Sequence, residues 1–313
     1  MRKIIILFIV SLSLQLLGKT QTSDLAIIKQ RITSELLYNI ASDNQVENML
    51  SKMNQEGNFK DIDYSDLSRN ASFPHARHTS NLEYLAKFYK NKTSKYYQSQ
   101  HLKDVIIKGL NFWIQHDFVG DNWHDNQITT PTNLMNILLA IGDELPKEMI
   151  EKLQPMIGRA NMKASGARPS GDRIVIAGIL AKNLLFNKND QLFDSIINII
   201  QDEMKFSTGE RGIQQDLSFH HRVDRVNNTD SYGYGKFANV YGEWATYVYG
   251  TKYQFSKEKI NLLIDYYLDG IYKQMVYGVY EDVSVRNRDI TIKRNGFTPK
   301  GILEIERLLA ITD

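Results

Sequence analysis

Cysteine is absent from the 313-residue sequence, and this absence limits how the protein can be stabilised. Without thiols the chain forms no disulfide, and it has no structural zinc site built on thiolates. The apolar N-terminus also lacks the cysteine that a lipoprotein anchor requires. The folded state must therefore depend on a hydrophobic core, which a chain of this length is long enough to form.

Net charge is nearly absent as well. The sequence has 38 Lys and Arg against 36 Asp and Glu, which is a formal charge of +2. Because Arg2 and Lys3 belong to the N-terminal segment, the rest of the chain is close to neutral. Overall charge gives no argument for binding nucleic acid or a polyanion, so any such site must be local. We expect no nucleic-acid partner.

A long apolar run occurs only at the N-terminus. Arg2 and Lys3 precede the apolar segment 4–17, and the small or polar residues Gly18-Lys19-Thr20 follow it. This order is typical of a secretory signal peptide. An uncleaved anchor is the alternative, but the apolar segment is short for a membrane span. We predict a signal peptide over residues 1–20, a secreted or periplasmic protein without a membrane span after signal cleavage, and one domain over residues 21–313.

Apolar residues recur at helical spacing through most of the chain. Ser23 and Asp24 are suited to begin the first helix, whose apolar stripe runs from Leu25 to Leu37. An alternating β-type pattern occurs only at 280–292. The sequence therefore predicts an all-α domain of about ten helices. The further helices are expected near 81–89, 102–116, 132–141, 147–157, 172–185, 191–204, 236–249, 257–275 and 299–310.

Polar loops join these helices, so consecutive helices are expected to pack as antiparallel hairpins. Hairpins of this length can close into a ring around a cleft. An α-solenoid is the alternative architecture, but no repeat of fixed period supports it.

The loop 122–131 is rich in amides and aromatic rings. Trp123 is flanked by Asn122, His124 and Asn126, which suits a sugar site because rings stack on C–H faces while amides bond hydroxyls. The alternative is a helix N-terminus, with Thr130 as the cap and Pro131 in the first turn. Both interpretations can hold together.

The loop 164–172 contains two glycines, a proline and Arg168, and it leads into a predicted helix. Backbone amides at a helix N-terminus favour an anion or a carboxylate. Most such loops only cap a helix, so this loop by itself is a weak indication of a site.

The segment 212–237 has the densest polar chemistry. It contains the pair His220-His221 beside Arg222, and then Tyr232 and Tyr234 in a Tyr-Gly-Tyr-Gly turn. These residues supply a candidate base, a candidate acid and a supporting cation. A metal site is a competing interpretation, but adjacent histidines do not easily place both rings on one ion, and no His-x-x-x-His motif is present. We therefore expect neither a metal nor another cofactor.

Local positive charge is concentrated near the C-terminus, where Arg286 and Arg288 precede Lys293-Arg294. An arginine cluster suits bidentate recognition of carboxylate or sulfate. The alternative is a solvated basic strand edge.

With these motifs the sequence resembles polysaccharide lyase family 8, the chondroitin AC, hyaluronate and xanthan lyases. Segment 57–64 is similar to the family's early Gly-x-aromatic-x-Asp turn, and 122–131 is similar to its Asn-Trp-Trp…Ile-x-x-Pro motif. Segment 212–219 resembles the stretch that leads to the catalytic His. Tyr232-Gly233 resembles the catalytic Tyr-Gly, and 286–288 resembles the Arg-bearing segment after it.

The chain departs from the family pattern at several of these residues. His124 stands in place of the second Trp of the aromatic motif. Arg168 stands in place of the Asn of the family's Gly-Ala-Asn loop, which neutralises the substrate carboxylate. Arg222 occupies the position of the family's His, so His221 fits that role with a shift of one residue.

The resemblance implies an incomplete α/α toroid, which in the family precedes a large β-sandwich domain. These 313 residues contain no β-rich segment. A separately encoded β-sandwich domain is therefore an expected candidate partner.

The resemblance also implies β-elimination at a uronic acid of an acidic polysaccharide such as chondroitin or hyaluronan. Tyr232, with Tyr234 as the alternative, removes the C5 proton and protonates the departing oxygen. His221, with His220 as the alternative, is its partner, and Arg288 orients the substrate. Stabilising the charge that develops on the carboxylate is expected to be the largest contribution. The expected substrate-binding residues are Asn122, Trp123, His124, Asn126, Arg168, His220, Arg222, Tyr234 and Arg286.

Two other functions stay open at this point. A non-catalytic glycan-binding fragment of a lyase would bind the polyanion without forming unsaturated ends. A hydrolase on the same helices would need a pair of carboxylates, and Asp216 with Asp282 are the candidates.

Overall fold

The computed structural model describes residues 23–38, 43–69, 73–276, 280–286, 306–307 and 309–311. The predicted signal peptide and Arg288 lie outside these residues, as does most of the helix expected at 299–310. In the described ranges, no helix combines the length and the apolar character needed to cross a membrane.

The described residues contain ten α-helices, so the prediction of an all-α chain with about ten helices is confirmed. The α-helices are α2 (Asp24–Leu36), α3 (Asp43–Lys52), α4 (Ala76–Lys90), α5 (Gln100–His116), α6 (Thr130–Ile141), α7 (Lys147–Ile157), α8 (Gly171–Phe186), α9 (Asp190–Asp202), α10 (Asn239–Val248) and α11 (Lys257–Asp265). The π-helical segments are η2 (Asp125–Thr129), η4 (Thr229–Ala238) and η5 (Tyr266–Ile271), and the 3-10 turns are η3 (Gly142–Glu144), η6 (Tyr272–Gln274) and η7 (Val283–Val285).

Two small antiparallel hairpins complete the described secondary structure. Strand β1 (Gly212–Ile213) pairs with β2 (Phe219–His220), and β3 (Met275–Val276) pairs with β4 (Tyr280–Glu281). Strands of two residues are too short to leave an alternating pattern in the sequence, which explains why the β1–β2 hairpin was not expected.

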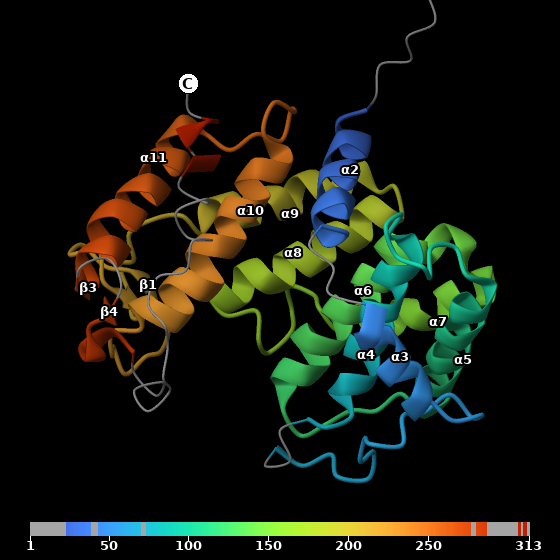
Figure 1. Ribbon diagram of the computed structural model, residues 1–313. Coiled ribbons are helices and arrows are strands. Elements are labelled where there is room, and N and C mark those ends of the chain that lie inside the picture. The colour runs from blue at the N-terminus through green and yellow to red at the C-terminus, as the bar shows by residue number, and fades with distance from the viewer. Residues whose placement is uncertain are drawn as a thin grey trace, which may run out of the picture.

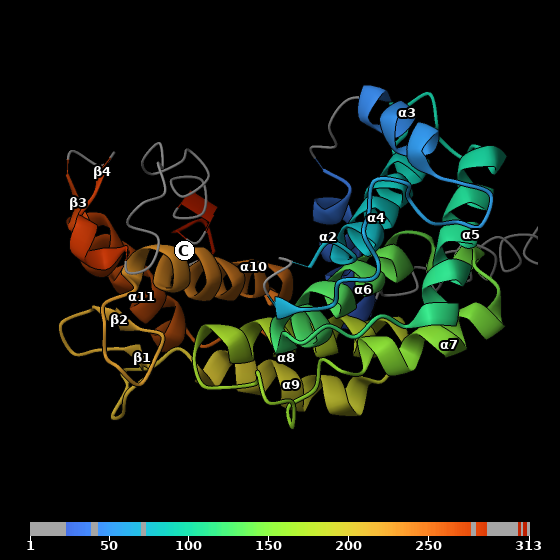
Figure 2. The ribbon, with the colours of Figure 1, turned by 90° about the horizontal axis from the view of Figure 1, so that it is seen from below.

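The helices follow one another along an open arc (Figure 1). Helices α4, α6, α8 and α10 form its inner layer, each in contact with the next, while α5 packs on α4, α7 on α6 and α9 on α8. Figure 2 shows α8 and α9 side by side between the two ends of the arc. This arrangement is the incomplete α/α toroid that the sequence predicts.

Helix α2 lies against the inner layer and contacts α6, α8 and α10. Its N-terminus is capped as expected, because the Ser23 hydroxyl accepts a hydrogen bond from Ala26 N at 3.3 Å. Arg31 Nη1 donates to the carbonyl oxygens of Tyr247 at 2.8 Å and Tyr249 at 2.5 Å, at the C-terminus of α10. A cation there satisfies carbonyls that the helix leaves unpaired.

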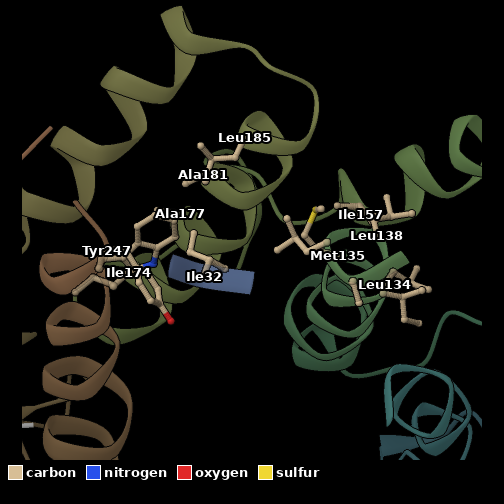
Figure 3. Packing of buried hydrophobic residues seen from close by; sticks show 14 of the residues in the cluster. Ile32, Leu134, Met135, Leu138, Ile157, Ile174, Ala177, Ala181, Leu185 and Tyr247 are labelled. Atoms are coloured by element: carbon tan, nitrogen blue, oxygen red, sulfur yellow. The ribbon is translucent and has the colours of Figure 1, made fainter. Parts of the chain in front are cut away.

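A hydrophobic core runs along the arc between the two layers of helices. Figure 3 shows Ile32 of α2 against Ile174 and Ala177 of α8, next to Tyr247 of α10. All of these residues are buried. Because apolar stripes on both sides of each inner helix are covered, the inner layer is held rigidly, and its helix ends can position side chains accurately.

Two local expectations were wrong. Thr130 does not cap α6, because the chain is already helical at η2 and the Thr130 amide donates to Asp125 O. Pro131 does occupy the first turn, as expected. Residues 283–285 form η7 rather than a strand, since the Asp282 carboxylate accepts from Ser284 N at 2.8 Å and caps this turn.

Candidate active site

Tyr232 and His221 meet although they come from different elements. Tyr232 lies in η4, which continues directly into α10, while His221 follows strand β2. Their rings stack with centroids 3.7 Å apart and planes inclined by 14°. Gly233 permits the close packing of η4, because a Cβ there would lie 2.2 Å from the Tyr266 hydroxyl oxygen. The structure thus brings together the first-choice residues of both pairs left open by the sequence.

His221 is neutral at neutral pH. Its side chain is buried, and this burial lowers the pKa of His221 to about 4. The carboxylate of Asp172, whose Oδ2 lies 3.5 Å from Nε2, opposes the decrease but does not cancel it. Lys236, Arg211 and Arg222 lower this pKa further through their positive charges.

Lys236 joins all three polar loops at one point. Its ammonium forms an ion pair with Asp172 in the first turn of α8. Its Nζ lies 3.5 Å from His124 Nε2 and 5.9 Å from the centroid of the Tyr232 ring. The loops that begin α6, α8 and α10 therefore converge at the N-terminal ends of three inner helices.

The loop with Trp123 forms a second, more exposed part of the site. The Arg168 guanidinium carbon lies 5.7 Å from the Trp123 ring centroid, and Arg168 Nε donates to Ser165 O at 3.0 Å. Gly166 permits this approach, since a Cβ there would lie 2.2 Å from the Trp123 ring. The backbone amide of Gly166 also donates to Gln127 Oε1 at 2.8 Å, which ties the two loops together.

Two of the predicted amides make local hydrogen bonds. Asn126 Oδ1 accepts from Gly120 N at 3.0 Å, and its Nδ2 donates to Gly120 O at 2.7 Å. Asn122 Oδ1 accepts from His124 N at 3.0 Å. Both side chains therefore shape the loop that carries Trp123.

The remaining predicted residues lie around this centre. Tyr234 packs edge-on against Tyr267 with centroids 6.2 Å apart. His220 pairs with Gly212 in the β1–β2 hairpin. Arg222 is exposed, whereas Arg286 is half-buried at the end of η7.

Asp172 and Lys236 received no role from the sequence, although both lie in segments that it singled out. Lys236 and His124 are 112 positions apart, and no local pattern links such distant residues. The sequence does show that Asp172 is a charged residue at the start of an apolar helix. An acidic residue is also common at an ordinary helix N-terminus, so this position did not indicate a role in the site.

The carboxylates proposed for a hydrolase do not have the required environment. Asp216 Oδ1 accepts from Ser218 Oγ at 2.7 Å, and this hydrogen bond lowers the pKa of Asp216. Asp282 accepts from Ser284 N, and hydrogen bonding to Ser284 likewise lowers its pKa. A glycosidase acid needs a raised pKa, so both carboxylates fit turns better than acid catalysis.

Within the described ranges, no group of three or more His, Cys, Asp or Glu side chains is placed to hold a metal ion.

Stability should depend on pH through His221. Its pKa is about 4 in the folded chain against 6.5 as the reference value, so between these values the unfolded chain binds more protons. The contribution of neutral His221 to the free energy of unfolding is therefore fully present above about pH 6.5. It is lost as the pH falls toward 4. We expect His221→Gln to reduce this pH dependence by up to about 1.4 kcal/mol per pH unit, measured by urea unfolding at several pH values. If the free energy of unfolding changed equally with pH in the original protein and in His221→Gln, the neutral, buried state of His221 would be contradicted.

The comparison with known proteins identifies the class to which this fold and site belong. The sequence profile described as polysaccharide lyase family 8, N terminal alpha-helical domain, matches residues 14–313. The chain belongs to polysaccharide lyase family 8, so the resemblance seen in its motifs is confirmed.

Individual relatives agree with this assignment. The chain is 28% identical to chondroitinase-AC of Pedobacter heparinus over 291 residues, which cover 91% of this chain and 40% of the relative. It therefore spans less than half the length of that protein.

Solved structures support the fold. A chondroitinase AC lyase solved with oligosaccharides superimposes with a TM-score of 0.81 at 24% identity, over 93% of this chain and 45% of that one. A Paenibacillus xanthan lyase gives a TM-score of 0.67 at 17% identity, over 84% and 26% of the two chains. At these identities the likeness supports the α/α toroid and does not by itself assign a substrate.

Proposed function

We propose that this chain forms the helical part of a polysaccharide lyase that cleaves a uronic-acid-containing polysaccharide, chondroitin- or hyaluronan-like, by β-elimination. The observation that carries the proposal is the neutral His221 stacked at 3.7 Å on Tyr232, beside the Lys236 ammonium. The names of the relatives, chondroitinase-AC and xanthan lyase, are consistent with this chemistry.

In the proposed reaction, ionised Tyr232 takes the C5 proton of the uronic acid. The electron pair of that C–H bond forms the C4=C5 double bond, and the C4–O bond breaks. Tyr232 then gives the proton to the departing glycosidic oxygen, which returns the tyrosine to its ionised form. No other proton donor is needed, so one residue serves as both base and acid.

His221 has a positioning role in this proposal. A neutral imidazole stacked on the ring fixes the orientation of Tyr232 without placing a second positive charge beside it. Trp123 and His124 would supply the apolar face for a sugar ring, and Arg168 and Arg222 would attract the polyanion. Arg288, as the cation that orients the substrate, stays a prediction.

The partner and the location belong to the same proposal. We infer an acidic polysaccharide as the ligand and a β-sandwich domain as a further partner, while the helical chain itself carries the reacting residues Tyr232 and His221. Export through a signal peptide at residues 1–20 also stays a prediction.

The test is an incubation of the protein with unsulfated chondroitin or hyaluronan while the ultraviolet absorbance of the C4=C5 bond is followed. We expect a steady rise without added metal. New reducing ends without absorbance would identify a hydrolase instead. Saturable binding without any new ends would identify a glycan-binding protein.

A further inference from the structure

We propose that Lys236, held in place by Asp172, is the cation that binds the uronate carboxylate at the reacting sugar. Family comparison would give this task to the residue at position 168, where this chain has Arg168. The inference rests on the proposed lyase function, because it names the group that recognises the substrate at the Tyr232 site.

The first argument is the number of donors on the ammonium. A lysine ammonium has three N–H donors and accepts no hydrogen bond. Asp172 Oδ1 forms an ion pair with the ammonium and His124 Nε2 lies 3.5 Å from Nζ, so these two neighbours occupy at most two of the donors. The third has no acceptor among the described residues and is left for a ligand.

The second argument is position. The Lys236 side chain is 18% exposed, whereas the side chain of its partner Asp172 is only 4% exposed. An approaching carboxylate therefore meets the ammonium before it meets Asp172. Because Nζ lies 5.9 Å from the Tyr232 ring centroid, a carboxylate bound there would place the adjacent C5 within reach of that residue.

The third argument is local charge. Lys236, Arg211 and Arg222 all act on His221 as cations, and Asp172 is the opposing anion in that set. With His221 neutral, this set holds three cations and one anion, and Asp230, buried in η4, is a second carboxylate near Tyr232. The site can therefore accept one more negative charge, and it stabilises the charge that develops on the carboxylate when the C5 proton leaves.

Arg168 is placed for another task. Its guanidinium lies over Trp123 and its Nε is bonded to Ser165 O. A cation held on a half-buried aromatic ring at the surface suits contact with a neighbouring part of the polymer.

The test compares two substrates, chondroitin and its uronate methyl ester, in which the carboxylate charge is removed. Lys236→Met should slow cleavage of the acid form by about 100-fold or more, and cleavage of the ester by less than about 3-fold. Lys236→Arg should recover part of the rate on the acid form. An equal loss on both substrates, or no loss, would overturn the proposal.

Two further variants test whether Lys236 recognises the substrate carboxylate or only supports the fold. Lys90 is a matched control, since it pairs with Glu144, lies 5.7 Å from the Tyr89 ring centroid and is 26% exposed. Lys90→Met should leave the ratio of acid to ester cleavage unchanged. The double variant Lys236→Met with Asp172→Asn leaves no unpaired buried carboxylate, and it should show the same selective loss on the acid form.

The experiment distinguishes an error in the lyase proposal from an error in the role of Lys236. If the unaltered protein forms no unsaturated product from either substrate, the lyase proposal is wrong. In that case the original protein and Lys236→Met are compared for their binding of chondroitin and of its uronate methyl ester. Lys236→Met must weaken binding of the acid form and spare the ester, and any other pattern overturns the role of Lys236.

Discussion

Tyr232→Phe is expected to abolish formation of unsaturated uronic-acid products, with a fall in kcat on the order of 10⁴-fold. A single hydroxyl is proposed to act first as base and then as acid, and each kind of proton transfer contributes on the order of 10² to 10⁴. Phenylalanine keeps the ring that stacks on His221, so the fold and the sugar contacts should survive. The measurement is the initial rate of the rise in ultraviolet absorbance, with thermal unfolding as a check on folding.

Tyr234→Phe is the matched comparison. Tyr234 lies in the same π-helical segment but packs edge-on against Tyr267 rather than on His221. Its hydroxyl is expected to contribute at most a substrate contact, so KM should rise by about 10-fold or less while kcat changes little. If Tyr234→Phe abolished turnover and Tyr232→Phe did not, the catalytic assignment would move to Tyr234.

Asp125→Ala is expected to destabilise the protein by about 3–5 kcal/mol, which corresponds to a fall in Tm of about 10 °C. Asp125 Oδ2 lies 2.8 Å from His75 Nε2, and both side chains are completely buried. Removing the carboxylate leaves the imidazole without its partner in a dry environment, where an unpaired polar group is costly. Urea unfolding at neutral pH measures the loss.

Asp117→Ala is the control for this prediction. Asp117 pairs with Arg159, but the two side chains are 38% and 25% exposed, so solvent screens the pair. The loss of this ion pair is expected to cost about 1 kcal/mol or less. Alanine at the left-handed φ of Asp117 adds roughly 1 kcal/mol, so the total stays below the cost at Asp125. Replacing His75 and Asp125 together by leucine should recover much of the stability, because no polar group is then left unpaired. Equal effects of Asp125→Ala and Asp117→Ala would contradict the importance of burial.

The Asp125 pair also supports the site. Asp125 is the first residue of η2 and follows Trp123 and His124 directly. Anchoring it to His75 of the preceding α4 region fixes the start of the loop that carries both rings. We therefore expect Asp125→Ala to raise KM for the polysaccharide as well as to lower stability.

The helices could be predicted because the interactions that define them are local. The bond from Ala26 N to Ser23 and the place of Pro131 in α6 involve neighbouring residues, and apolar spacing selects the buried face. Helix α3 was not expected, since only Val46 among its residues is buried and its periodicity is correspondingly weak. The family motifs are also short segments of sequence, and the resemblance that they carry predicted the α/α toroid.

The composition of the site could be predicted only in part. His221 and Tyr232, whose rings stack in the structure, were singled out because they share one dense segment with a family motif. Lys236 and Asp172 were not assigned, although they stand beside those two residues. Their pairing depends on how α8 and η4 pack, and no spacing along the chain encodes that contact.

The sequence by itself determined the cysteine-free helical framework, the family and the segments that carry polar chemistry. Only the tertiary structure decided that His221 is neutral, that it stacks on Tyr232, and that Lys236 joins His124 to Asp172. The physical reason is that helix formation follows interactions a few residues long. Burial and ion pairing at the site follow from the packing of α8, η2 and η4, which are distant in sequence.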